Sequence, residues 1–123
     1  MNKADLTKEV YKVIPVNCNG CPECDGGLAG AFWRVNPLQM NAYKRRVDGV
    51  EINGYAISTE CVFIDTMRGL GILEKALIGI GKLESMILLC PKIGGGIAGF
   101  NFESEILPLI EKHLQNHDVI FVE

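Results

Sequence analysis

The fold of this chain is decided by the stretch Pro91-Lys92-Ile93-Gly94-Gly95-Gly96-Ile97-Ala98-Gly99-Phe100. It follows an apolar run, Met86–Cys90, which is typical of a strand that is covered on both faces. Because glycine has no Cβ, the backbone amides of such a turn can approach a phosphate closely, and the N-terminus of a following helix adds its positive end. We therefore expect a phosphate-binding turn made by Gly94, Gly95, Gly96, Ile97, Ala98, Gly99 and Phe100.

A second glycine-rich turn lies nearer the N-terminus. It runs from Val16-Asn17-Cys18-Asn19-Gly20 to Asp25-Gly26-Gly27-Leu28-Ala29, between a strand pattern and a helical pattern. Both turns follow strands, so both should lie at the carboxyl edge of the sheet, where open α/β folds bind ligands. Either turn alone could be structural. The pair predicts a diphosphate that is held between them.

Strand and helix patterns alternate along the 123 residues. This alternation predicts an α/β fold, a three-layer α/β/α sandwich with a mixed, mostly parallel sheet, in a single domain over residues 1–123. The remaining expected elements are a strand at Val10–Val16, helices at Leu28–Val35, Leu38–Arg46, Leu70–Leu83 and Ser104 to about Gln115, and strands at Tyr55–Ser58, Cys61–Thr66 and Asp118–Val122.

Four local features carry further expectations. Pro15 lacks a ladder donor and predicts an edge strand or a bulge. Leu28, Phe32 and Val35 should form the buried face of their helix, and Ser104 should cap the last one. The two histidines, His113 and His117, should be solvated residues near the end of that helix.

Composition limits the class of protein. With 48% hydrophobic and 22% charged residues, the chain is typical of a soluble globular protein. A net charge of -3 argues against a nucleic-acid binder, whose footprint would be basic. No apolar run approaches the roughly 20 residues of a membrane span, so we expect no membrane partner and a cytoplasmic protein with reduced cysteines.

The turn sequences also allow other chemistry. The spacing Cys18-x-x-Cys21-x-x-Cys24 could place three thiolates around one metal ion, or the loop could hold unliganded cysteines. Carboxylates that could serve a site are Asp5, Glu23, Asp25 and Asp65. Asp25 directly precedes the first glycine pair, where it could orient a ribose hydroxyl or a water, or cap the helix.

Together, the two turns resemble those of the macro domain, a family that binds ADP-ribose. The resemblance covers nearly the whole chain, and its most specific part is Pro91–Gly99, which is similar to the Pro-x-Ile-Gly-x-Gly diphosphate loop. Weaker matches are the Asp5-Leu6, Val16–Gly20, Gly26–Ala29 and Phe102-Glu103 stretches. The chain looks like the compact branch that contains ADP-ribose-1''-phosphate phosphatases and ADP-ribosyl-glutamate hydrolases, with a shortened N-terminus.

The resemblance implies a role for each part of the site. Asp5 would accept a hydrogen bond from the adenine amine, and Asn17 or Asn19 would contact the distal ribose. Backbone amides of the stretches Gly26, Gly27, Leu28, Ala29 and Gly95–Phe100 would hold the diphosphate. Phe100 would wall the ribose, or else belong to the core. No separate cofactor is implied.

The departures from the family leave the reaction open. Ile14 and Pro15 occupy the region where the phosphatase branch has a histidine, while Met67 and Ala98 stand for the lysine and aspartate of the hydrolase branch. Our first hypothesis is a module that reads ADP-ribosylated protein or sequesters an ADP-ribose-derived nucleotide. The alternatives are a hydrolase that removes ADP-ribose from protein or phosphate from ADP-ribose-1''-phosphate, with Asp25 or a bound water acting, and a structural or metal protein built on the cysteine loop.

Overall fold

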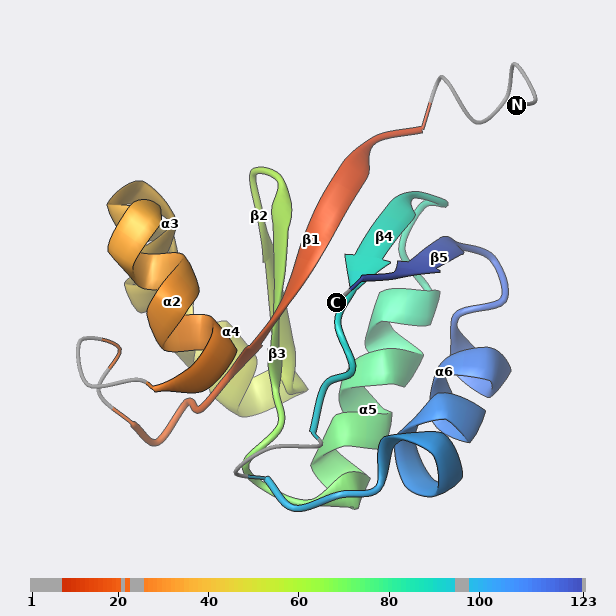
Figure 1. Cartoon of the computed structure of the whole chain (residues 1–123). Coiled ribbons are helices and arrows are strands. Elements are labelled where there is room, and N and C mark those ends of the chain that lie inside the picture. Colours follow the sequence, from red (N-terminus) through yellow and green to blue (C-terminus); the bar gives the residue numbers. More distant parts are fainter. Residues whose placement is uncertain (1–7, 21, 23–25, 95–97, 123) are drawn as a thin grey trace.

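A five-stranded sheet runs through the molecule in the order β2-β3-β1-β4-β5 (Figure 1). The structure is a computed structural model that describes residues 8–20, 22, 26–94 and 98–122. The strands are β1 (Val10–Val16), β2 (Tyr55–Ser58), β3 (Cys61–Asp65), β4 (Ile87–Cys90) and β5 (Asp118–Phe121). β1 pairs in parallel with β3 and β4, and β4 does so with β5, whereas β2 is antiparallel to β3. The predicted mixed, mostly parallel sheet is confirmed.

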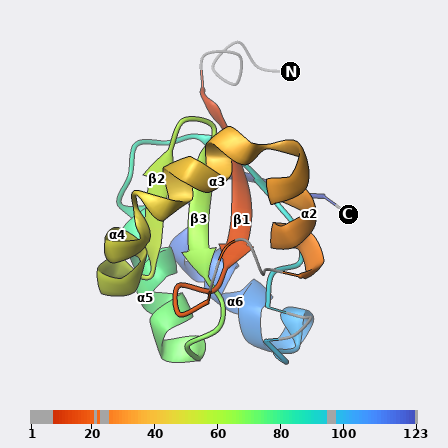
Figure 2. The same cartoon turned by 90° about the vertical axis from the view of Figure 1, so that its left-hand side faces the viewer.

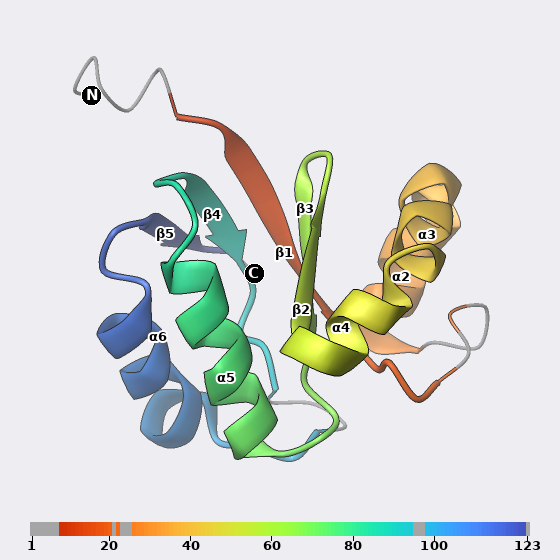
Figure 3. The ribbon, with the colours of Figure 1, turned by 180° about the vertical axis from the view of Figure 1, so that it is seen from behind.

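Helices cover both faces of the sheet. One face carries α2 (Gly27–Val35), α3 (Pro37–Lys44) and α4 (Val47–Asn53), which stand in front of the sheet in Figure 2. The other carries α5 (Leu70–Gly81) and a π-helical turn, η2 (Phe102–Ile106), which continues into α6 (Leu107–His113), as Figure 3 shows. This confirms the three-layer arrangement. The helix α4 was not predicted from the sequence.

The sheet separates two hydrophobic clusters, and the strands supply both by alternation. On β1, Val13 faces the α5 and α6 side, while Ile14 and Val16 face the α2 to α4 side. β3 follows the same rule with Val62 and Ile64 on one side and Cys61 and Phe63 on the other; all of its residues are buried. Because β1 and β3 are packed between the two clusters, the residues at their carboxyl ends are held in defined positions.

The buried face of α2 differs from the prediction. Leu28 is 50% exposed and Val35 is 77% exposed, whereas Ala29 and Trp33 are buried. Trp33 stacks on Tyr43 with ring centroids 5.6 Å apart. The large indole, with more area to bury than either aliphatic side chain, determines the rotation of the helix.

Pro15 lies in a central strand, so the edge-strand prediction is wrong. The amide of Lys12 donates toward the β3 side, to Glu60 O at 2.8 Å. By alternation, the nitrogen of Pro15 faces the β4 side. β1 pairs with β4 only over Val10–Lys12, so the missing donor interrupts no ladder.

The C-terminal part also corrects three expectations. Asn101, not Ser104, caps the last helical segment, because its side chain accepts from the Ser104 amide at 3.0 Å. His117 is only 6% exposed, and it accepts from the Met86 amide at Nδ1 while Nε2 lies 2.8 Å from Ile80 O. This pairing defines the neutral tautomer that carries its proton on Nε2. On β4, Ile87 and Leu89 are half-buried, so that strand is not fully covered on both faces.

Within the part of the chain that the structure describes, no helix is both long and apolar enough to cross a membrane.

Candidate functional site

The carboxyl ends of β1, β3 and β4 lie at one edge of the sheet. β1 and β3 are parallel and end in register, with Val16 opposite Asp65, and both arrowheads point to the lower edge in Figure 2. β4 runs in the same direction beside β1. The first turn, the segment after β3 and the second turn therefore leave the sheet at the same edge. This juxtaposition was expected from the strand polarity alone.

The first turn is closed by its own asparagine. Asn17 accepts from the Gly20 amide through its backbone oxygen at 3.0 Å and from the Asn19 amide through Oδ1 at 3.1 Å. Thus the amide oxygen of Asn17 shapes the turn, and among the described residues no group accepts from its Nδ2, which could donate to a ligand. Both asparagines that we expected at a distal ribose lie in this turn at the carboxyl edge.

The start of α2 offers backbone donors with few competitors. Gly26 is the N-cap residue, with φ −101° and ψ −172°, and as a glycine it has no side chain with which to cap the helix. The first turn of α2 contains no acidic residue. The first amides of a helix have no acceptor within it, and the helix dipole makes them favourable for an anion. A Cβ built on Gly26 or Gly27 meets no atom of the described residues within 4 Å, so these residues leave the approach to the amides open on that side.

The second turn is shaped by glycine and packing. Gly94 has φ +79°, and its oxygen accepts from the Phe100 amide at 2.8 Å. Ile93 is buried, and Phe100 packs partly buried against the α5-side cluster. Phe100 is thus at least a packing residue; a contact with ribose stays a prediction. Ala98 and Gly99 complete the described part of this turn, and Gly99 also has φ +79°.

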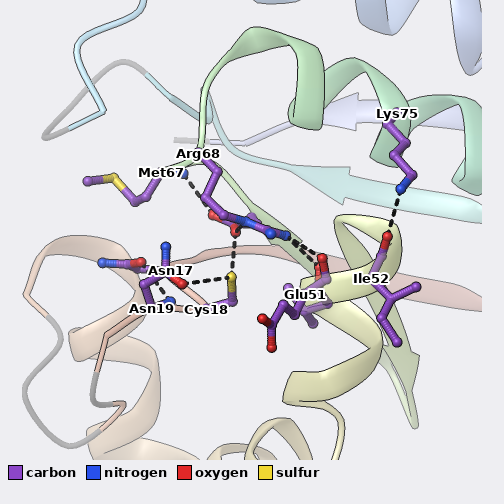
Figure 4. A network of polar contacts seen from close by, with 10 residues as sticks. Asn17, Cys18, Asn19, Glu51, Ile52, Met67, Arg68 and Lys75 are labelled. Carbon is purple, nitrogen blue, oxygen red and sulfur yellow. Dashed lines mark hydrogen bonds and ion pairs between the residues drawn. The ribbon is translucent and has the colours of Figure 1, made fainter.

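A buried carboxylate connects the segments at this edge, and Figure 4 labels three residues that donate to it, Cys18, Met67 and Arg68. Asp65, the last residue of β3, is 0% exposed. Its Oδ1 accepts from the Met67 amide at 2.8 Å, and its Oδ2 accepts from Cys18 Sγ at 2.8 Å and from Arg68 Nε at 2.5 Å. Arg68 Nη2 donates in turn to the α4 oxygens of Val50 and Glu51, at 2.9 and 3.0 Å.

These contacts set the protonation states of the cluster. Burial, with the hydrogen bond to Asp65, raises the pKa of the Cys18 thiol to about 11, so Cys18 is a neutral donor at neutral pH. Burial alone would lower the pKa of Arg68, but its hydrogen bond and attraction to Asp65 outweigh burial and raise it. The guanidinium therefore remains charged opposite Asp65. Such a thiol is a poor nucleophile and a poor metal ligand, because both roles need the thiolate.

Sequence reasoning named Asp65 among possible site carboxylates but missed its connection to Cys18 and Arg68. An aspartate that ends an otherwise apolar strand, followed three positions later by an arginine, was the local signal that could have pointed to a paired buried charge. The contact with Cys18 spans 47 positions and had no local signal.

Several predicted site residues lie outside the described residues. These are Asp5, Cys21, Glu23, Cys24, Asp25, Gly95, Gly96 and Ile97. The metal hypothesis keeps only Cys18 within the described ranges, and no group of three or more His, Cys, Asp or Glu residues that could hold a metal ion occurs in them.

A groove of about 590 Å³ opens at the opposite, amino edge of the sheet. Three of its polar side chains are engaged with protein groups: Lys8 pairs with Asp118 at 2.9 Å, and the Tyr11 hydroxyl donates to Glu9 at 2.7 Å. None of the described residues of the two glycine-rich turns lines this groove. We therefore place the candidate site at the carboxyl edge, where free backbone donors and the polar cluster lie.

Comparison with known proteins identifies the fold. No protein-family model matches the sequence, and no curated protein matches it. The structure is similar to the macrodomain of Thermus aquaticus DarG, with a TM-score of 0.66, 19% identity, and coverage of 97% of this chain and 93% of that one. It is also similar to the macrodomain of Mycobacterium tuberculosis DarG, with a TM-score of 0.62, 19% identity, and coverage of 98% and 93%. The chain has the macrodomain fold.

Proposed function

We propose that this macrodomain-fold protein binds ADP-ribose, or a nucleotide derived from it, as a reader of ADP-ribosylated protein or as a sequestering module. The observation that carries the proposal is the start of α2: its N-cap residue is a glycine and its first turn has no acidic residue, and it lies at the sheet edge that the second glycine-rich turn also reaches. Backbone amides from both turns would hold the diphosphate. Neutral donors of this kind suit a chain whose net charge is -3.

A binding role is favoured over hydrolysis by the state of the described side chains. Asp65 is fully buried, and both of its oxygens accept hydrogen bonds from protein groups. A general base must reach the proton that it removes, which this carboxylate cannot do. Met67 and Ala98 stand where the resemblance places the lysine and aspartate of the hydrolase branch, and neither can exchange a proton.

The first test is calorimetric titration with ADP-ribose, with AMP and NAD as comparisons. We expect a dissociation constant in the micromolar range, about -8 kcal/mol, and much weaker binding of AMP, which lacks the diphosphate and the distal ribose. If ADP-ribose does not bind, the proposal is wrong. Turnover of an ADP-ribosylated peptide by the wild-type protein would favour the hydrolase instead.

Gly26→Asp separates binding from folding. The extended backbone at Gly26 suits an aspartate N-cap, so the variant should be more stable by about 1 kcal/mol. The same carboxylate takes the amide donors and repels a diphosphate, so affinity for ADP-ribose should fall at least about tenfold. Gly26→Ala is the matched control, because its methyl group enters open space without a charge. Unchanged affinity in Gly26→Asp would remove the α2 terminus from the site.

A further inference from the structure

Asp65 lies at the end of β3, where two segments of the carboxyl edge meet. It receives the Met67 amide and Arg68 Nε from the segment after β3, and the Cys18 thiol from the first glycine-rich turn. Both of its oxygens are occupied and the residue is 0% exposed. Asp65 therefore acts on the surroundings only through the groups that donate to it.

Arg68 fixes the position of that carboxylate. Its Nη2 donates to the oxygens of Val50 and Glu51 in the last turn of α4, and Lys75 Nζ donates to Ile52 O there at 2.7 Å. Cations are favoured at a helix C-terminus, where the last carbonyls lack partners within the helix. Arg68 is thus held between Asp65 and α4, and the carboxylate cannot move without the loss of these contacts (Figure 4).

Cys18 connects Asp65 to the first turn through its thiol hydrogen bond. Its side chain packs partly buried against the α2-side cluster, so the thiol meets an apolar surface and a carboxylate at once. On either side of Cys18 lie Asn17 and Asn19, which shape the turn through the Asn19 amide bond to Asn17 Oδ1. Holding Cys18 to Asp65 therefore holds both asparagines at the edge of the sheet.

We propose that Asp65 is a positioning residue for the nucleotide site: through the Cys18 thiol it fixes the start of the first glycine-rich turn, residues 17–20, in the conformation that receives ADP-ribose. This inference rests on the proposed function, because it deepens the account of the same site. Asp65 itself touches no ligand. Its role is to order the turn before binding, so that less conformational entropy is lost when the ligand binds.

The test compares wild type with three cysteine variants. Two change the side chain at position 18, and the third is a control at another buried cysteine. Cys18→Ala removes the donor, and Cys18→Ser keeps a hydroxyl donor in the same place. Cys61→Ala is the matched control, since Cys61 is buried in the same α2-side cluster but at the other end of β3. Two properties are measured for each protein: ADP-ribose affinity by calorimetry, and backbone motion at Asn19 and Gly20 by NMR amide relaxation without ligand.

Cys18→Ala should weaken ADP-ribose binding by about tenfold and increase the motion of the Asn19 and Gly20 amides. Cys18→Ser should restore both properties close to wild type. Cys61→Ala should lower the melting temperature and leave both unchanged. This rescue is the sign of positioning, because a purely structural loss would appear in Cys61→Ala as well.

The outcomes separate the two proposals. If wild type binds and Cys18→Ala binds within twofold of it, the positioning role is wrong while the proposed function stands. Unchanged amide motion in Cys18→Ala overturns the positioning role whether or not a ligand binds. If wild type does not bind ADP-ribose at all, the proposed function fails, and with it the role of Asp65 in an ADP-ribose site.

Discussion

The two glycine-rich turns reach the same edge of the sheet, but they are fixed there in different ways. The first turn is held by polar side chains, through Cys18 and the buried Asp65. The second is held by its backbone and by packing: the Phe100 amide donates to Gly94 O, and a side chain on Gly94 would overlap Ile106.

This difference predicts which changes each turn can tolerate. A buried carboxylate needs its partners, because an unpaired charge in the interior is costly. A close-packed glycine needs space, because overpacking forces neighbours to move. Changes of charge should therefore damage the first turn, and changes of volume should damage the second.

The largest effect is expected from Arg68→Met. The side chain of Arg68 is 20% exposed and its partner Asp65 is fully buried, so the variant leaves a buried carboxylate without its cation. We expect a loss of about 4 kcal/mol in the free energy of unfolding, measured by urea denaturation. Adding Asp65→Asn should recover part of that loss, because the unpaired charge is then removed.

The matched change in the second turn is Lys92→Met. Lys92 pairs with Glu103 at 3.3 Å, but both side chains are more than 60% exposed, at 63% and 65%. An exposed ion pair of this kind contributes little to stability, so the variant should have the same free energy of unfolding as wild type. Equal losses in Arg68→Met and Lys92→Met would end the distinction between the two turns.

A change of side-chain volume should destabilise the second turn. At Gly94 the backbone has φ +79°, and an added Cβ would overlap Ile106 and approach Phe100 Cδ2 at 3.1 Å. Gly94→Ala should therefore cost about 3 kcal/mol, from backbone strain and overpacking together. The measurement is again the free energy of unfolding.

Gly99→Ala isolates the packing part of this effect. Gly99 has the same φ of +79°, but a Cβ there meets nothing within 4 Å. Its cost should be that of strain alone, about 1 kcal/mol. If both variants lose the same stability, packing does not hold the second turn.

The same contrast explains what could be predicted from the sequence. The place of both turns followed from local signals, since glycines after a strand pattern and the polarity of parallel strands need no long-range information. The contact of Cys18 with Asp65 joins residues from separate segments, and only the register of β1 with β3 brings them together. Arg68, three positions after Asp65, is a local signal within one segment, whereas the contact with Cys18 depends on the pairing of separate strands.

Errors elsewhere have the same origin. Leu28 and Val35 fit a helical face by spacing, but Trp33 occupies the core because Tyr43 supplies a ring to stack on. His117 lies beyond the end of α6, and its burial depends on a backbone amide and a carbonyl from other segments. In each case the deciding partner is remote in sequence.

The smallest expected effect is the dependence of the first turn on alkaline pH. Because burial and the bond to Asp65 raise the pKa of Cys18 to about 11, the folded protein holds this proton more tightly than the unfolded chain. The resulting stability is complete below the ordinary pKa of a thiol and is lost as pH rises toward 11. Above that value the thiolate no longer donates to Asp65 and repels it.

Cys18→Ser is the control for this effect, since a serine hydroxyl donates without titrating in this range. Unfolding free energies measured at about pH 8 and about pH 10 should fall further in wild type than in the variant, by less than about 1 kcal/mol because Cys18 is only partly buried. Cys61 and Cys90, whose pKa values burial raises to about 11 and about 12, titrate in both proteins and cancel in the comparison. Identical pH profiles would mean that the thiol does not hold the turn to Asp65. A larger pH dependence in wild type would show that the hydrogen bond from the Cys18 thiol to Asp65 stabilises the first turn. The second turn, which is held by backbone and packing, has no such dependence on a titrating side chain.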